Sequence, residues 1–230
     1  MLKKKIIKIF FFIFISPFIY LIIKVIYPFK KIKFGQLVSE RIGHFSANTE
    51  LYLCNKIITN NKSLDFFFNR SPISNEYFDK IIKRKVNIVN EYLGHSVYKL
   101  LQILGEKNHI IDFVNEDRDT SNILSKSNKI LCIGKKDIEF GYNEIKKFGL
   151  KKQDKWVCVI ARDSQYLTEY LNNIDFSYHD YRDSNIENYF KAINYLTSKG
   201  YFVFRMGKKM QNRINTNNPK IIDYAFSPHK

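Results

Sequence analysis

Short apolar runs alternate with amphipathic stretches along most of this chain, and this alternation limits the folds open to it more than any other feature. The runs are rich in β-branched and aromatic residues, and they predict strands at residues 32–38, 64–69, 86–89 and 110–114. Helices are expected at about 46–58, after a cap at Ser74, and at 94–104. Strands that alternate with helices form a parallel sheet covered by helices, so the sequence predicts an α/β fold.

The end of the chain repeats this alternation with charged residues at the strand ends. The runs Val157-Cys-Val-Ile-Ala-Arg-Asp163 and Tyr201-Phe-Val-Phe-Arg-Met-Gly207 flank an amphipathic stretch at 185–199, which is closed by Gly200. The pattern predicts a βαβ unit, and ligands of open α/β sheets bind beyond the carboxyl ends of the strands. Guanidinium groups at that edge suit a phosphate-bearing ligand, because their fixed donors match phosphate oxygens.

Between residues 115 and 154 the pattern weakens and polar residues dominate, and the lysine-rich stretch 146–152 is typical of a linker. We therefore expect a Rossmann-like domain at 31–150 and a partial second domain at 151–230. A single βαβ unit followed by a tail at residues 221–230 leaves one sheet face and one edge unsupported. The chain is thus expected to be a fragment of a longer reading frame, truncated within its second domain.

Residues 1–30 are expected to form a membrane anchor. Ile and Phe dominate residues 6–29, and residues 9–23 carry no charge. Fifteen helical residues reach roughly 22 Å, less than the hydrocarbon core of about 30 Å, but flanking lysines can extend the span. Pro17 at the centre predicts a kink.

Two forms of this anchor stay open. A single-pass helix and a bent, re-entrant or interfacial hairpin fit the sequence equally well, because lysines flank both ends and give no orientation for a span. A signal peptide is disfavoured because no small-residue cleavage site follows, and a buried core helix fits the three preceding lysines poorly. In either form, the globular part is expected on the cytoplasmic side of the membrane.

The formal net charge of +16 would suit a nucleic-acid partner, but its distribution argues against one. Residues 1–33 contain eight lysines and no acid, so half of the excess belongs to the anchor, and the rest forms no stripe. No glycine pattern of a dehydrogenase or of a P-loop nucleotidase is present. Cys132 and Cys158 lie in apolar runs and are expected in the core.

Several motifs occur here in the order that is typical of one protein family. They are Arg41-Ile-Gly-His44, Asn48-Thr-Glu-Leu-Tyr52, Arg162-Asp163, Tyr178-His-Asp-Tyr-Arg-Asp183 and Gly200-Tyr-Phe-Val-Phe-Arg-Met-Gly207. Over residues 30–230 the chain resembles a bacterial family of glycosyltransferases that build surface polysaccharides. It is also similar to the fucosyltransferase-like group, which carries a His-x-Arg type motif near the donor site. The resemblance implies the two-domain GT-B architecture.

The resemblance implies transfer of a sugar from a nucleotide donor to a surface polysaccharide or a lipid-linked acceptor. The nucleotide sugar is then a co-substrate, and no other cofactor is expected. Such a reaction needs a base for the acceptor hydroxyl and positive groups for the departing nucleoside diphosphate. The donor and phosphate candidates are Arg162, Asp163, His179, Arg182, Asp183, Arg205 and Gly207, of which Arg205 is the best placed.

On the acceptor side, the loop with Arg41 and Gly43 leads to His44, a candidate base because its ordinary pKa lies near neutrality. Glu50 is the alternative base. Each candidate also has a structural interpretation. Arg205 could be a surface residue at a strand end, Arg182 could belong to a salt-bridge cluster, and His44 could cap or pack a helix.

Two other functions stay open. Asp117-Arg-Asp119 is a D-x-D pattern after an apolar run, as metal-dependent GT-A transferases use to hold Mg²⁺ or Mn²⁺ against a diphosphate. The pattern is short and begins a polar region, so a solvated loop is the stronger interpretation and no metal is expected. The non-enzymatic alternative is a membrane-tethered fragment that is not catalytic.

Overall fold

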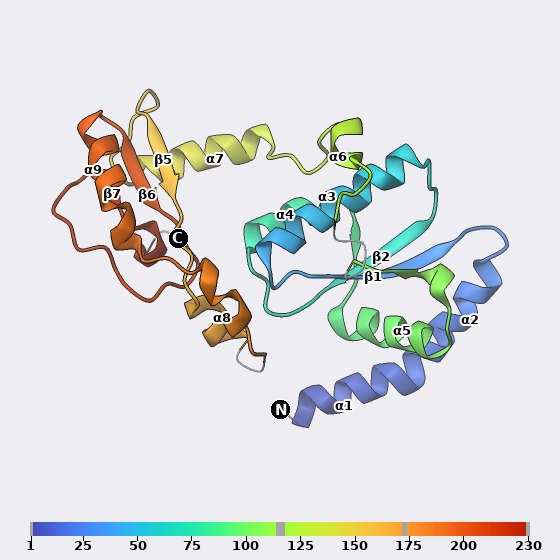
Figure 1. Cartoon of the computed structure of the whole chain (residues 1–230). Coiled ribbons are helices and arrows are strands. Elements are labelled where there is room, and N and C mark those ends of the chain that lie inside the picture. Colours follow the sequence, from blue (N-terminus) through green and yellow to red (C-terminus); the bar gives the residue numbers. More distant parts are fainter. Residues whose placement is uncertain (1, 114–117, 172–173, 229–230) are drawn as a thin grey trace. The chain divides into compact units, whose positions relative to one another are not determined.

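The computed structural model describes residues 2–113, 118–171 and 174–228, with side chains from residue 5 on. It is an α/β protein with two parallel sheets (Figure 1). The chain divides into two compact units, Met1–Ile133 and Gly134–Lys230. The division therefore falls earlier than the boundary expected near residue 150.

The sheet of the first unit has the strand order β3-β2-β1-β4. Its strands are β1 (Ile32–Leu37), β2 (Leu64–Asn69), β3 (Asn87–Ile88) and β4 (Ile110–Ile111). All of its strand pairs are parallel, and β1 and β2 are paired from Ile32 with Leu64 to Leu37 with Asn69. The four predicted strands are confirmed, although β3 and β4 are shorter than expected and residue 114 lies outside the described residues.

Helices cover both faces of this sheet (Figure 1). On one face, α3 (Ile42–Ile58) and α4 (Glu76–Lys83) pack with the strands around a core that includes Phe45, Phe67 and Ile82. On the other face, α5 (Glu91–Ile103) contributes Val97 and Leu101 to a second core. The side chain of Asn75 caps α4 by accepting a hydrogen bond from the backbone of Phe78, one residue beyond the expected cap at Ser74.

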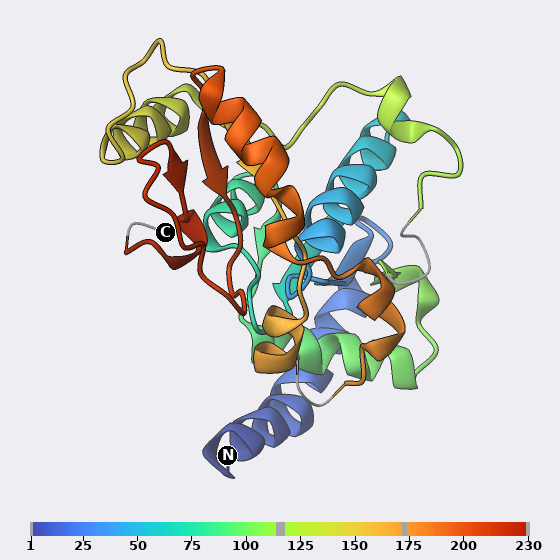
Figure 2. The ribbon, with the colours of Figure 1, turned by 60° about the vertical axis from the view of Figure 1, so that its left-hand side comes forward.

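The N-terminal segment forms a helical rod made of α1 (Leu2–Phe10), the π-helical turn η1 (Phe11–Ile15) and α2 (Ser16–Ile26). The expected disturbance at Pro17 appears as this π-helical turn, since proline cannot donate the usual helical hydrogen bond. Both ribbon views show the rod running beside α5 (Figures 1 and 2). Within the described residues, Lys5–Ile26 is the one helix long and apolar enough to cross a membrane.

One face of α2 belongs to the protein core, which the sequence analysis ranked low. Ile23 is fully buried among Ile32, Phe34, Val97 and Leu101. The three lysines at positions 3–5 disfavoured a core helix, but they lie in α1, in the first half of the rod. Only the second half packs against the sheet.

The region between the two strand-rich segments is more helical than its polar composition indicates. It contains α6 (Ile123–Lys126) and α7 (Lys135–Lys146), whereas the short η2 (Lys107–His109) precedes β4. The stretch predicted as a linker is the end of α7 and a turn at Gly149, whose φ of 83° favours glycine. Phe148 packs edge-on against Phe204 of the second sheet, with ring centroids 5.6 Å apart, which ties α7 to the second unit.

The second unit contains a three-stranded parallel sheet in the order β5-β6-β7. Its strands are β5 (Trp156–Val159), β6 (Phe202–Arg205) and β7 (Ile221–Ile222). The βαβ prediction is confirmed, and the segment expected as a tail adds the third strand. The shorter elements are α8 (Gln165–Tyr170), η3 (Ser177–Arg182), η4 (Ile186–Tyr189) and η5 (Tyr224–Phe226).

The helix α9 (Phe190–Ser198) supplies the core of this second unit. Ile193 packs against Val203 and Ile221, and all three side chains are buried. Cys158 and Cys132 are exposed, so the expectation that both lie in a core is wrong. Cys158 is on the strand face opposite Val157 and Val159, which shows that an apolar run need not be buried on both sides.

A tight contact between α5 and β2 generates a stability prediction. A Cβ atom at Gly94 would lie 2.6 Å from the Phe68 side chain, closer than carbon atoms tolerate. Gly94→Ala should therefore destabilise the first unit by roughly 1–3 kcal/mol, the usual effect of overpacking. Urea unfolding followed by far-UV circular dichroism measures the change.

The matched control is Gly43→Ala in the first turn of α3, where an added Cβ meets nothing within 4 Å. This variant should be neutral or more stable by about 0.5–1 kcal/mol, because alanine loses less entropy in a helix. Equal unfolding midpoints for Gly94→Ala and the parent chain would contradict the packing described for α5.

Candidate functional site

A polar crevice lies at the carboxyl ends of β5 and β6, the edge where ligands of parallel sheets bind. Its volume is about 270 Å³. Loop residues after both strands and the start of η4 line it: Ala161, Asp163, Ser164, Asp183, Ser184, Asn185, Ile186, Arg205, Gln211 and Asn212. Three of the predicted donor-side residues therefore share one cavity, namely Asp163, Asp183 and Arg205.

Arg205 is the last residue of β6 and one of the largest fully buried side chains, with 1% of its surface exposed. Its Nη1 donates a hydrogen bond of 3.0 Å to Oδ1 of Asp223, and its guanidinium lies 5.5 Å from the Phe226 ring centroid. Its buried Nε has no hydrogen-bond partner among the described residues. A buried donor without an acceptor costs about 1–3 kcal/mol.

Asp223 was missing from the predicted site, although it directly follows the apolar pair Ile221–Ile222. It does two things at once. Oδ1 accepts from Arg205, and Oδ2 accepts from the backbone N–H of Ile214 at 2.8 Å. An acid directly after two β-branched residues could have indicated a strand end at Asp223. It was missed because the segment was expected to be a tail.

Asp163 and Asp183 are already engaged by neighbouring groups. The two oxygens of Asp163 accept backbone N–H groups of Gln165 at 3.1 Å and Gln211 at 3.0 Å. Asp183 forms an ion pair with Arg162, whose Nη1 also donates to the carbonyl of His179 at 2.9 Å. Arg162 is therefore not part of the crevice lining. It holds the loop of Asp183 in place through this ion pair.

Arg182 does not join the other two arginines. Its Nε donates to the hydroxyl of Tyr181 at 2.9 Å, and its guanidinium lies 5.3 Å from the centroid of that ring. Tyr181 is 78% exposed, so this pair lies on the surface. The predicted convergence of three arginines is therefore wrong for Arg182, because an adjacent aromatic ring offers its guanidinium a local partner.

The motif residues His179 and Gly207 also have local explanations. The His179 ring stacks with aromatic neighbours, 4.0 Å from the Tyr178 ring centroid and 6.4 Å from that of Phe176. A Cβ at Gly207 would lie 2.3 Å from the sulfur of Met210. The close approach that requires glycine here is therefore that of Met210, whereas a phosphate was predicted.

The acceptor-side residues belong to the first unit. Arg41 is the N-cap of α3, and Gly43 and His44 lie in its first turn, so the expected loop is a helix start. His44 Nδ1 and Asn48 Nδ2 are 3.5 Å apart. Glu50 accepts backbone N–H groups of Ile130 at 2.7 Å and Leu131 at 2.8 Å, which makes it a tie between α3 and a distant loop.

The D-x-D pattern is described only in part. Asp117 lies outside the described residues. Asp119 accepts the backbone N–H groups of Ile123 at 2.6 Å and Leu124 at 3.0 Å, so it caps the start of α6. Among the residues that the structure describes, no three His, Cys, Asp or Glu side chains gather as a metal-binding group.

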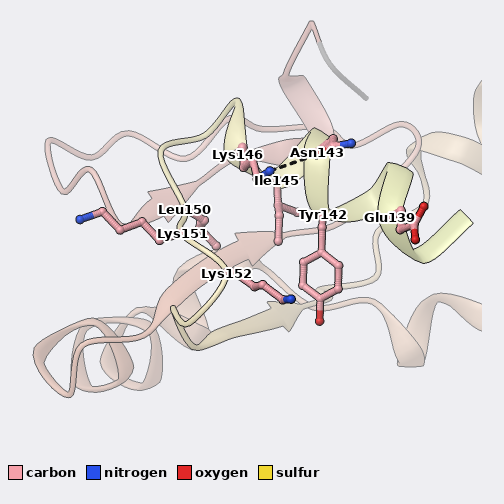
Figure 3. A pocket seen from close by; sticks show the side chains of 8 residues that line it. All are labelled: Glu139, Tyr142, Asn143, Ile145, Lys146, Leu150, Lys151 and Lys152. Atoms are coloured by element: carbon pink, nitrogen blue, oxygen red, sulfur yellow. Dashed lines mark hydrogen bonds between the residues drawn. The ribbon is translucent and has the colours of Figure 1, made fainter. Parts of the chain in front are cut away.

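A second cavity, of about 340 Å³, lies between α7 and the segment that follows it (Figure 3). Lys146, Lys151 and Lys152 line it together with Tyr142 and Glu139. Lys146 Nζ donates to the Asn143 side chain at 3.1 Å. The sequence interpretation missed this cavity because it assigned the lysine-rich stretch to a linker.

Comparisons of the chain with protein-family models, with curated proteins and with solved structures gave no match. Inference about function therefore depends on the cavities and the residues that line them. The crevice at the strand ends combines a buried cation, two carboxylates and several amides, whereas three of the eight residues that line the α7 cavity are lysines. The crevice is the better candidate site.

The buried pair of Arg205 and Asp223 generates a prediction about stability. Asp223→Ala leaves the guanidinium buried without its counter-ion and frees the Ile214 N–H, so it should destabilise the second unit by about 3–5 kcal/mol. Trp156, the single tryptophan, is in β5 and reports unfolding of this unit by fluorescence in urea.

Two further variants control this measurement. Asp180→Ala removes an exposed carboxylate from the same unit and should leave the midpoint unchanged. The double variant Arg205→Met with Asp223→Leu removes both charges and should recover part of the lost stability. A double variant no more stable than Asp223→Ala would show that the ion pair is not the cause.

Proposed function

We propose that this protein is a membrane-associated glycosyltransferase whose second unit binds a nucleotide sugar in the crevice at the ends of β5 and β6. The observation that carries the proposal is Arg205. A guanidinium that is buried at a strand end, with one N–H unsatisfied among the described residues, is suited to hold a phosphate oxygen. The family resemblance of the motifs around it supports the same function.

The composition of the crevice favours a ligand with few charges and many hydroxyl groups. One guanidinium faces two carboxylates, and Asn185, Gln211 and Asn212 add amide groups that both donate and accept. A bare polyphosphate would be repelled by the carboxylates at close range. A sugar or ribose offers hydroxyl donors to them while a single phosphate oxygen approaches Arg205.

The proposal also includes the architecture, the acceptor and the catalytic base. Two parallel α/β units in one chain fit the GT-B architecture, which the resemblance implies. The apolar N-terminal helix suits a lipid-linked or surface-polysaccharide acceptor, with the globular units on the cytoplasmic side. In such a reaction a base removes the acceptor proton while positive groups stabilise the leaving diphosphate. The base role of His44 stays a prediction.

The proposal predicts that nucleoside diphosphates and their sugar conjugates bind the full chain and that Arg205 is needed for this. Arg205→Lys keeps the charge opposite Asp223 but loses the planar fork of donors, so the fold should survive while affinity falls. We expect a loss of at least tenfold, or about 1.4 kcal/mol, in isothermal titration with a panel of these ligands.

Arg182→Lys is the matched control, since it makes the same chemical change on the exposed Tyr181 pair. It should leave affinity unchanged. Equal weakening by both variants would remove the crevice as the binding site. Failure of every nucleotide in the panel to bind the folded chain would overturn the proposed function.

A further inference from the structure

The helical rod at the N-terminus presents two different faces along its whole length. The face toward the protein includes Phe11, Ser16, Ile19 and Ile23, of which Ser16 and Ile23 are fully buried. The opposite face is a continuous exposed apolar stripe, defined here as Ile6, Ile9, Phe10, Ile13, Phe14, Phe18, Leu21, Ile22 and Val25. Its members recur every three to four residues, the spacing of one helix face.

This stripe is far more exposed than an ordinary surface helix allows. Phe14, Phe18 and Val25 have 65%, 64% and 73% of their surfaces exposed. Contiguous apolar patches of this kind mark sites that contact a membrane or another protein. The stripe contains no polar side chain within the described residues.

The inner face fixes the second half of the rod to the first unit. Lys24 Nζ lies 2.5 Å from Oε1 of Glu106, and the Tyr20 hydroxyl donates to the same oxygen at 2.8 Å. The hydrogen bonds from Lys24 and then Tyr20 lower the pKa of the Glu106 carboxyl below its usual value. Phe11 stacks on Tyr92 of α5 with ring centroids 6.4 Å apart, so contacts extend back into η1.

A transmembrane position of the rod would break this attachment or carry its partners into the bilayer. If α2 left the fold, Val97 and Leu101, both completely buried, would lose their cover, as would Phe34 on β1. If α2 stayed attached, the charged residues Glu91 and Lys99 of α5 would enter the hydrocarbon with it, which is unfavourable. A position in the plane of the membrane surface avoids both costs.

Charge identifies the occupant of the stripe. The exposed Lys5 and Lys8 lie at its start, and the exposed Lys30 follows its end, with no acid in residues 1–39. Anionic lipid headgroups complement these ends, and ammonium groups reach them by extending from an immersed helix. A second copy of the chain is a poorer occupant, because pairing two stripes would bring like charges together.

We propose that the rod from Lys5 to Ile26 lies in the plane of one anionic leaflet, with its exposed stripe in the acyl region and its inner face on the protein. The chain is then a monotopic protein that does not cross the bilayer. This explains why the rod is apolar on two faces, since one face is covered by protein and the other by lipid. The inference does not depend on sugar transfer.

Vesicle binding of the full chain tests the stripe. The variant Phe14→Glu with Phe18→Glu charges two exposed positions and leaves the buried face intact. Partitioning onto vesicles of phosphatidylcholine and phosphatidylglycerol should fall at least tenfold, measured by flotation. The matched control is Tyr181→Glu with Tyr195→Glu, which charges two aromatic residues that are 78% and 63% exposed in the second unit, and it should bind like the parent chain.

Lipid and salt provide a second arm of this test. Parent-chain binding should weaken when phosphatidylglycerol is omitted and when salt is raised, because the lysines contribute by charge. Binding by the Phe14→Glu, Phe18→Glu variant equal to that of the parent chain would overturn the proposal. So would a dimer, detected by analytical ultracentrifugation, that this variant dissociates while vesicle binding is unchanged.

Depth measurements separate an in-plane rod from a span. Ile6→Trp, Phe14→Trp and Val25→Trp, each combined with Trp156→Phe, place one fluorophore at the start, middle and end of the stripe. With lipids brominated at different depths, the in-plane rod should place all three at one shallow depth. A span would bury position 14 at the bilayer centre and leave positions 6 and 25 near opposite surfaces, which would refute the in-plane position.

Discussion

The ion pair between Arg205 and Asp223 is the interaction on which the second unit and its crevice depend. A guanidinium that ends a strand in the core is unfavourable unless it is paired, and Asp223 supplies the charge. The same carboxylate holds the N–H of Ile214, so the segment between β6 and β7 is fixed by the residue that neutralises Arg205. That segment contributes Gln211 and Asn212 to the crevice. The Asp223 side chain thus links the end of β6 to the loop that follows it, and this loop forms part of the crevice wall.

In the first unit, a comparable constraint comes from α2, which has one face in the protein core and one face exposed. The sheet has α3 and α4 on one face, whereas on the other face α5 leaves part of the apolar surface for α2 to cover. Packing against the sheet requires apolar residues on the face of α2 that contacts the protein. It does not explain the apolar residues on the opposite, exposed face. The mean hydropathy of the rod counts the apolar residues of both faces together, and for this reason it indicates a membrane span.

The sequence predicted what depends on local pattern and missed what depends on distant partners. Period-two and helical spacing located β1, β2 and β6 to within a residue or two. The start of α3 was missed by four residues because the N-cap of this helix is Arg41, which is not a capping residue type and makes no side-chain capping hydrogen bond. The convergence of arginines failed at Arg182, where Tyr181 is adjacent but the orientation of its ring cannot be derived from spacing. The partnership of Arg205 with Asp223 joins residues 18 positions apart, beyond the range of any helical or strand period.

The hydrogen bonds of three carboxylates bear on which residue could act as a catalytic base. Glu50, Asp163 and Asp119 stood out in the sequence as chemically useful acids, yet each accepts two backbone N–H groups, which for Glu50 come from a distant segment. Oxygens used in this way hold loops together, and freeing one for proton transfer would leave buried or turn N–H groups without acceptors. An acid that ties two segments is therefore a poor base, however well it is placed along the sequence. For the proposed sugar transfer, Glu50 is therefore a poorer candidate base than His44, which lies in the first turn of α3, shortly after β1.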